Sequence, residues 1–123
     1  MPSVLIVDDS EDVRYVVRKF LEGGTTFTVC GEAADGLDAI KKAEELKPDV
    51  VLIDLRMPKM NGIETAMVLR RVLPKVQIVL FSNYTDEIGT TLASAVGINL
   101  VVPKGSLADI AKTLKTLIDI KPS

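Results

Sequence analysis

Histidine and tryptophan are absent from this sequence, and Cys30 is its only cysteine. These absences exclude disulfide bonds within the chain, zinc sites built from histidine and cysteine, and every histidine-dependent catalytic triad. Aromatic residues make up 4% of the chain and the net charge is -2, so no basic or stacking surface for direct nucleic-acid binding is expected. What remains is chemistry based on oxygen atoms.

Long apolar runs are also missing. No stretch is long enough to span a bilayer, and the N-terminus lacks the charged segment and apolar run of a secretory signal. We therefore expect a cytoplasmic protein without membrane contact. The length of 123 residues suits a single domain over residues 1–123, with a core from about residue 4 to about residue 120 and no second domain in the chain.

Short apolar runs alternate with amphipathic segments along the chain. Five runs are predicted as strands, and they cover residues 4–7, 27–32, 50–53, 76–81 and 98–102; the first is typical of a strand buried on both faces. The segments between them show helical spacing. The first such stripe comprises Val13, Val16, Val17, Phe20 and Leu21, and it is closed by Gly23 and Gly24.

Helix-capping residues support the same division. Asp35 can cap the second helix, Asn61 and Glu64 have capping-box spacing at the start of the third, and Ser106 and Asp109 have it at the last. Five strands alternating with five helices predict an α/β fold with right-handed crossovers. We expect a doubly wound (βα)5 flavodoxin-like three-layer sandwich with a five-stranded parallel sheet of order 2-1-3-4-5.

Carboxylates stand where two of these strands end. Asp8 and Asp9 follow the first run and Asp54 follows the third, and in this strand order the two strands are neighbours. The three side chains should therefore converge at the edge where such sheets bind ligands. Because converging carboxylates repel one another, a cation is expected, and a few hard oxygen ligands open to water suit Mg²⁺, or Mn²⁺ in its place.

The other strand ends add a hydroxyl and an ammonium group. Ser82 ends the fourth strand and Lys104 follows the fifth. Such a set suits phosphoryl transfer to a carboxylate, with Asp54 as the nucleophile, the metal and Lys104 stabilising the phosphoryl oxygens, and Ser82 donating a hydrogen bond to the product. The acyl phosphate adds charge at the sheet edge, so the site would act as a switch.

These residues resemble a known family. The segments LIVDDS, VLIDLRMPKMNG, IVLFS and PKG occur in the order and approximate spacing of receiver domains of two-component response regulators. Each segment is weak alone, but together they are very specific, and the similarity covers roughly residues 4–120. The resemblance implies a chemotaxis-regulator-like fold and a signalling switch that does not turn over an external substrate.

The resemblance also implies roles for particular residues. Asp8 and Asp9 would hold Mg²⁺, with Asp9 the more direct ligand, together with Asp54 and the main-chain carbonyl of Arg56. Asp54 would accept the phosphoryl group from a phosphohistidine on a sensor histidine kinase or phosphotransfer protein, which fits the absence of histidine here.

Some positions depart from the family pattern. Val101 stands where an aromatic switch residue is usual, so output cannot be transmitted by rotation of an aromatic ring. Asn83 replaces a small residue after Ser82 and could narrow access to the site. Tyr84 and Arg56 occupy variable positions that modulate the rate of dephosphorylation in the family.

Two alternatives remain open. The first is a pseudo-receiver, an interaction module that keeps the fold but does not signal by phosphorylation; Val101 and Asn83 keep this interpretation open. The second is a phosphatase of the haloacid dehalogenase type, which needs a second aspartate where this chain has Arg56. The length also leaves no room for that family's usual cap domain.

The output is not visible in the sequence. We expect either a downstream protein partner or a missing C-terminal effector domain, and segments such as GGTTFTVCGEAADG are faintly similar to receivers of the NarL/FixJ type. A phosphorylation-dependent homodimer is a further partner to consider. The family's usual signalling surface is formed by the fourth helix, fifth strand and fifth helix.

Overall fold

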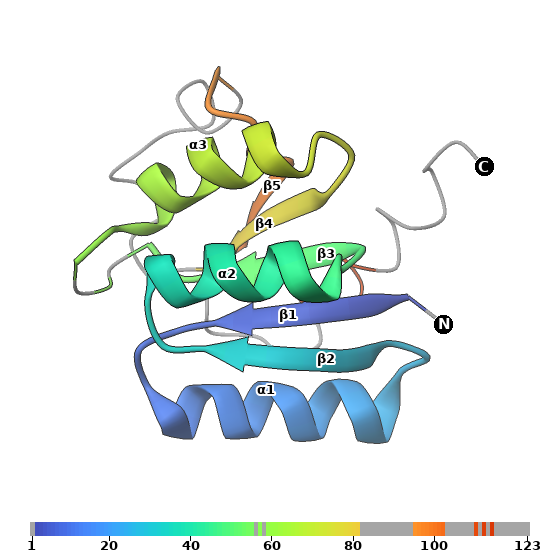
Figure 1. Cartoon of the computed structure of the whole chain (residues 1–123). Coiled ribbons are helices and arrows are strands. Elements are labelled where there is room, and N and C mark those ends of the chain that lie inside the picture. The colour runs from blue at the N-terminus through green and yellow to red at the C-terminus, as the bar shows by residue number, and fades with distance from the viewer. Residues whose placement is uncertain are drawn as a thin grey trace.

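The computed structural model describes residues 2–55, 57, 59–81, 95–102, 110, 112 and 114. Its elements in chain order are β1 (Ser3–Val7), α1 (Glu11–Gly24), β2 (Thr28–Ala33), α2 (Gly36–Leu46), β3 (Val50–Ile53), α3 (Gly62–Val72), β4 (Gln77–Phe81) and β5 (Leu100–Val102). The strands form one sheet in the order β2-β1-β3-β4-β5, and every neighbouring pair is parallel (Figure 1). The predicted doubly wound fold and strand order are confirmed.

The sheet is buried on both faces, which explains why its strands are continuous apolar runs rather than alternating ones. In β1, Val4 and Ile6 pack with residues of α1, whereas Leu5 and Val7 pack with residues of α2 and α3. Figure 1 shows α1 on one side of the sheet and α2 on the other. The side chains of the central strands β1 and β3 therefore divide between two core layers.

The predicted elements agree with the observed ones to within about two residues at most ends. One detail of the first helix was wrong. Val16 is 49% exposed although its spacing placed it in the apolar stripe, because Val17 and Leu21 already occupy the face that meets the sheet. α1 ends at Gly24, as predicted, and its C-cap Thr25 is in an extended conformation.

The predicted caps of α2 and α3 are present. The Asp35 side chain accepts a hydrogen bond from the N–H of Asp38, at 2.8 Å. Asn61 and Glu64 exchange side-chain and backbone hydrogen bonds in a capping box. The predicted fourth helix lies almost wholly outside the described residues. Of the last helix only three residues are described; Ile110 and Leu114 are buried against the α1 side of the sheet.

Among the described residues, no helix combines the length and apolar character that crossing a bilayer requires.

Leu69 and Met67 allow a matched test of this core, since both lie in α3. Leu69 is fully buried and Met67 is 45% exposed. We expect Leu69→Ala to lower the free energy of unfolding by about 2–5 kcal/mol, because it removes buried methyl groups and leaves a cavity. Met67→Ala should change it by less than about 0.5 kcal/mol. Urea denaturation followed by circular dichroism measures both; equal losses would mean that α3 does not pack through Leu69.

Candidate functional site

The register of the central strands brings the first and third strand ends together. Val7 of β1 lies beside Ile53 of β3, and each is followed at once by an aspartate. The N–H of Asp54 donates to the carbonyl of Val7 at 2.9 Å, and the N–H of Asp8 donates to the carbonyl of Ala33 at 3.1 Å. These backbone hydrogen bonds continue the sheet for one residue and place both aspartates at its carboxyl edge.

Asp8, Asp9 and Asp54 form one cluster. One carboxylate oxygen from each lies within 4.8 Å of the others. Asp8 is 1% exposed and Asp54 is 5% exposed, whereas Asp9 is exposed to solvent. The strand order predicted that the three carboxylates converge; the structure adds that Asp8 and Asp54 are buried and that the side at Asp9 is open.

The donor set fits a hard divalent cation. Mg²⁺ binds oxygen ligands at about 2.0–2.1 Å, so ligands on opposite sides of one ion stand roughly 4 Å apart. The three oxygens lie within 4.8 Å of one another, a separation that small movements of the side chains could close around one ion, and the open side leaves room for water and phosphate oxygens. The three carboxylates that could hold Mg²⁺ are thus together at one edge of the sheet.

Asp8 is held in place by the start of α1. Its Oδ1 accepts a hydrogen bond from the N–H of Ser10 at 2.9 Å. Ser10 is also the N-cap of α1, since its side chain accepts from the N–H of Val13. The turn that orients the Asp8 carboxylate and the cap that begins the helix therefore share one residue.

A charged network links α1 to β2 beside the cluster. Arg14 donates from Nε to Glu32 Oε1 at 3.0 Å and from Nη1 to the carbonyl oxygen of Asp8 at 2.6 Å. Arg18 donates from Nη1 to the other Glu32 oxygen at 2.5 Å. Burial acts to raise the pKa of Glu32, but the hydrogen bonds from Arg18 and Arg14 outweigh it and hold that pKa below its ordinary value.

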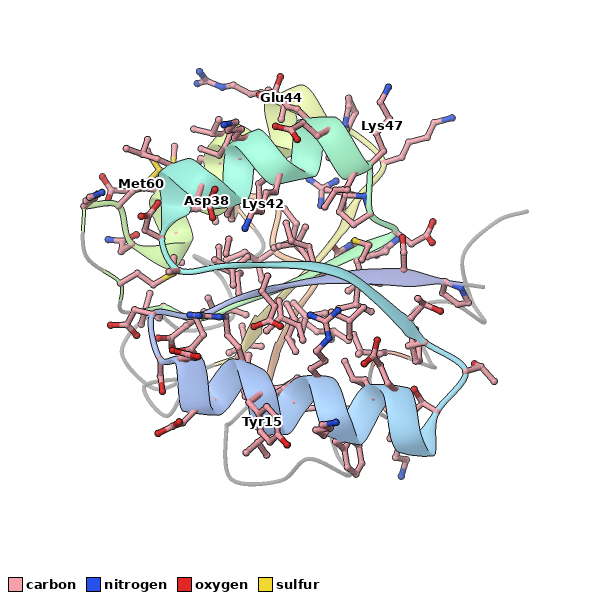
Figure 2. All side chains as sticks on the ribbon, turned by 60° about the horizontal axis from the view of Figure 1, so that its bottom comes forward. Tyr15, Asp38, Lys42, Glu44, Lys47 and Met60 are labelled. Atoms are coloured by element: carbon pink, nitrogen blue, oxygen red, sulfur yellow. The ribbon has the colours of Figure 1, made fainter. Side chains whose placement is uncertain are left out.

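The edge strand β2 is also tied to α2. Lys42 donates from Nζ to the main-chain carbonyl of Glu32 and forms a salt bridge with Asp38 at 3.1 Å. Figure 2 shows Lys42 reaching from α2 toward β2. The end of β2 is thus hydrogen-bonded to both α1 and α2.

The loop that follows Asp54 runs close to the start of α3. A Cβ atom at Gly62 would lie 2.3 Å from the carbonyl oxygen of Asp54, so only glycine fits there. The Gly62 N–H donates to the carbonyl of Leu55 at 2.7 Å and closes the loop. Gly62 therefore determines how closely α3 approaches the backbone of Asp54.

The same loop is supported from α2. Lys59 adopts a left-handed conformation (φ 70°), and its ammonium lies 3.6 Å from the Asp35 carboxylate. The hydrogen bond from the Asp38 N–H, aided by Lys59, lowers the pKa of Asp35. Met60 lies beside the start of α2 (Figure 2), where a Cβ at Gly36 would contact it at 3.0 Å.

The remaining predicted site residues are only partly placed. Ser82, Asn83, Tyr84, Lys104 and Arg56 lie outside the described residues. Val101 is described: it lies in β5 beside Leu80 of β4, half-buried on the face that α2 and α3 cover. Three of the predicted carboxylates are therefore brought together, and the predictions for the other residues remain predictions.

Comparison with known families agrees with this geometry. The family model described as "Response regulator receiver domain" matches residues 4–115. The chain belongs to this family. The resemblance noted in the sequence is confirmed, and receiver domains act in two-component signalling rather than in the turnover of an external substrate.

Individual relatives and solved structures agree with this family assignment. The chain is 36% identical over 113 residues to the response regulator protein VraR of Staphylococcus saprophyticus; the match covers 91% of this chain but only 54% of VraR. The receiver domain of Thermotoga maritima CheB superposes with a TM-score of 0.84 at 30% identity, covering 98% of this chain and 96% of that one. A LuxR-family response regulator from Aurantimonas sp. superposes with a TM-score of 0.89 at 26% identity, covering 98% and 89%.

Sequence reasoning missed Arg14, Glu32 and Gly62. Arg14 and Glu32 belong to no recognised motif, and although α1 and β2 are consecutive elements, the sequence does not show which of their side chains meet. Gly62 carried a usable signal, since a glycine directly after the cap Asn61 follows a strand end by only eight residues. The close approach of α3 to Asp54 still required the folded chain.

Gly62 gives a test of this approach. We expect Gly62→Ala to lower the free energy of unfolding by about 1–3 kcal/mol, because the new methyl group would overlap the backbone of Asp54. Gly23→Ala is the matched control: nothing lies within 4 Å of its Cβ position, so it should raise that free energy by roughly 0.5 kcal/mol. Urea denaturation compares the two; a stabilising Gly62→Ala would show that the loop moves aside freely.

Glu32 gives a pH-dependent test. Its folded-state pKa lies below the ordinary value of 4.5, so its salt bridges stabilise the fold above that pH and are lost as the pH falls through the folded-state pKa. Glu32→Gln should lower the free energy of unfolding by about 0.2–1 kcal/mol at neutral pH, since the pairs are partly exposed. This difference should shrink toward zero in acid. Urea denaturation of the exposed variant Glu44→Gln across the same pH series is the control, and a deficit for Glu32→Gln that persists unchanged in acid would contradict the assignment.

Proposed function

We propose that this chain is a phospho-accepting switch that takes a phosphoryl group onto Asp54 in a Mg²⁺-dependent reaction. The observation that carries the proposal is the convergence of the Asp8, Asp9 and Asp54 carboxylates at the carboxyl edge of the sheet. Membership of the receiver family supports it.

In the proposed reaction, a carboxylate oxygen of Asp54 attacks the phosphorus of a phosphohistidine on a sensor kinase or phosphotransfer protein. The P–O bond to Asp54 forms as the P–N bond breaks, and the departing imidazole keeps the electron pair and takes a proton. The product is an acyl phosphate on this chain. Asp54 is 5% exposed, so the attack takes place at the rim of the site rather than in open solvent.

The neighbouring residues have distinct proposed roles. Asp8 and Asp9, with Asp54 and the main-chain carbonyl of Arg56, hold the metal. When bound, Mg²⁺ (or Mn²⁺) offsets the negative charge that gathers on the phosphoryl oxygens. Ser82 and Lys104 are proposed to contact the phosphoryl group as hydrogen-bond donor and cation.

The output is proposed to leave through the surface that includes β5. Since Val101 of β5 is aliphatic and half-buried, the switch has to work by shifts of packing rather than by rotation of a ring. Asn83 and Tyr84 are proposed to modulate the rates.

The chain spans about half of VraR, which supports a C-terminal effector domain in a longer regulator. The similarity to a LuxR-family response regulator supports an effector of the NarL/FixJ type. A phosphorylation-dependent homodimer is a further part of the proposal. A separate downstream protein is the alternative, and the single domain predicted over residues 1–123 stays a prediction. The match to a signalling family supports the switch over a phosphatase of the haloacid dehalogenase type.

Intact-protein mass spectrometry tests the switch. After incubation with a small acyl-phosphate donor and Mg²⁺, we expect one phosphoryl adduct per chain, because Asp54 is the single proposed phosphoacceptor and Asp8 and Asp9 are proposed to hold the metal. The adduct should disappear when Mg²⁺ is chelated and in Asp54→Ala.

Asp49→Ala is the matched control, since Asp49 lies at the opposite end of β3 and its carboxylate binds Ser3. It should keep the adduct. No adduct on the folded wild-type chain in any condition would contradict the proposal and favour the pseudo-receiver, an interaction module without phosphate signalling, with Asn83 as the first residue to change.

A further inference from the structure

Arg14 touches both the acidic cluster and the network on β2. Its Nη1 donates to the main-chain carbonyl of Asp8 at 2.6 Å, and its Nε donates to Glu32 at 3.0 Å. The side chain is only 15% exposed, so the guanidinium is enclosed between α1 and β2 rather than free in solvent. Its two contacts use different N–H groups of the planar fork.

The carbonyl that Arg14 binds belongs to the peptide that joins Asp8 to Asp9. A peptide unit is planar, so the direction of its carbonyl also determines where the Cα of the next residue lies. The other side of Asp8 is already held, because its N–H donates to Ala33 and its Oδ1 accepts from Ser10. Arg14 binds the carbonyl on the remaining side of Asp8, where the chain continues to Asp9.

We propose that Arg14 is a positioning residue for the metal site: it fixes the Asp8–Asp9 peptide so that both carboxylates face Asp54. The inference rests on the proposed function, because it assigns Arg14 a role toward that same site. It also assigns a role to Glu32, which holds the guanidinium on the carbonyl and away from the carboxylates that a cation would bind.

The geometry explains why a lysine could not replace Arg14 in this role. A guanidinium presents several N–H groups in a rigid fork, whereas an ammonium is a single point at the end of a flexible chain. A lysine at this position would keep the charge but could not hold the Asp8 carbonyl and Glu32 in their present directions together. Arg14→Lys therefore removes the pair of hydrogen bonds that orients the Asp8 carbonyl but keeps the positive charge.

Arg18 offers a matched control on the same helix. It binds the other oxygen of Glu32 and pairs with Glu22 at 3.4 Å, so its described contacts are with side chains rather than with the Asp8 backbone. Arg18→Lys makes the same chemical change one turn away and perturbs the same Glu32 carboxylate. A general effect of disturbing the network would appear equally in both variants.

The experiment has two readouts on the wild type, Arg14→Lys and Arg18→Lys. The first is the hydrogen exchange of the Ser10 amide in metal-free protein, measured by NMR, since this N–H reports the turn at Asp8. The second is the dissociation constant for Mg²⁺. In Arg14→Lys we expect the Ser10 amide to exchange about tenfold faster and the dissociation constant to rise about tenfold, as for residues that orient metal ligands. Arg18→Lys should stay within about twofold of the wild type in both, because surface contacts of this kind contribute little.

Equal behaviour of the two variants in both readouts would overturn the positioning role. Failure of the proposed function looks different: the wild type would form no adduct on Asp54, while Ser10 exchange would still separate the two variants. If Arg14→Lys proves too unstable to measure, Glu32→Ala leaves Arg14 in place without the carboxylate that orients it. The same changes in smaller size are then expected, and wild-type values in that variant would equally overturn the inference.

Discussion

The pairing of β1 with β3 is the constraint from which the site and the core both follow. Val7 lies beside Ile53, and the next hydrogen bond, from Asp54 to Val7, places the two strand ends side by side. A shift of one residue would move every side chain of a strand to the opposite face of the sheet. The same register that sorts the apolar residues into two core layers therefore also brings Asp8 and Asp54 to one site.

Gathering carboxylates in this way opposes folding, because like charges at short range repel and burial disfavours the ionised form. The structure offsets part of this cost locally. The Ser10 N–H binds the Asp8 carboxylate, and Arg14 brings a positive charge to its carbonyl. The cluster also lies at the beginning of α1, where backbone N–H groups favour negative charge. The open side at Asp9 is where a cation would complete the balance.

Close packing couples Asp54 to the elements around it. Gly62 lets the start of α3 press against the Asp54 backbone, and Lys59 and Met60 brace the intervening loop against α2. Since packed interfaces of this kind respond to small shifts as units, added charge on Asp54 would shift the elements packed around it. In the proposed switch, where Val101 stands in place of the family's usual aromatic residue, transmission would rely on such packing contacts.

The strands, the caps of α2 and α3, and the clustering of the three aspartates could all be predicted from the amino-acid sequence. Those features depend on local patterns, such as apolar runs, capping boxes and strand ends, and on the few ways in which βα units can be wound. The exposure of Val16 depended on which side of α1 faces the sheet. Two further features emerged only in the folded chain: the hydrogen bond from Arg14 to the Asp8 carbonyl, and the need for glycine at position 62. Each depends on the exact distance between two elements, which local sequence patterns do not determine.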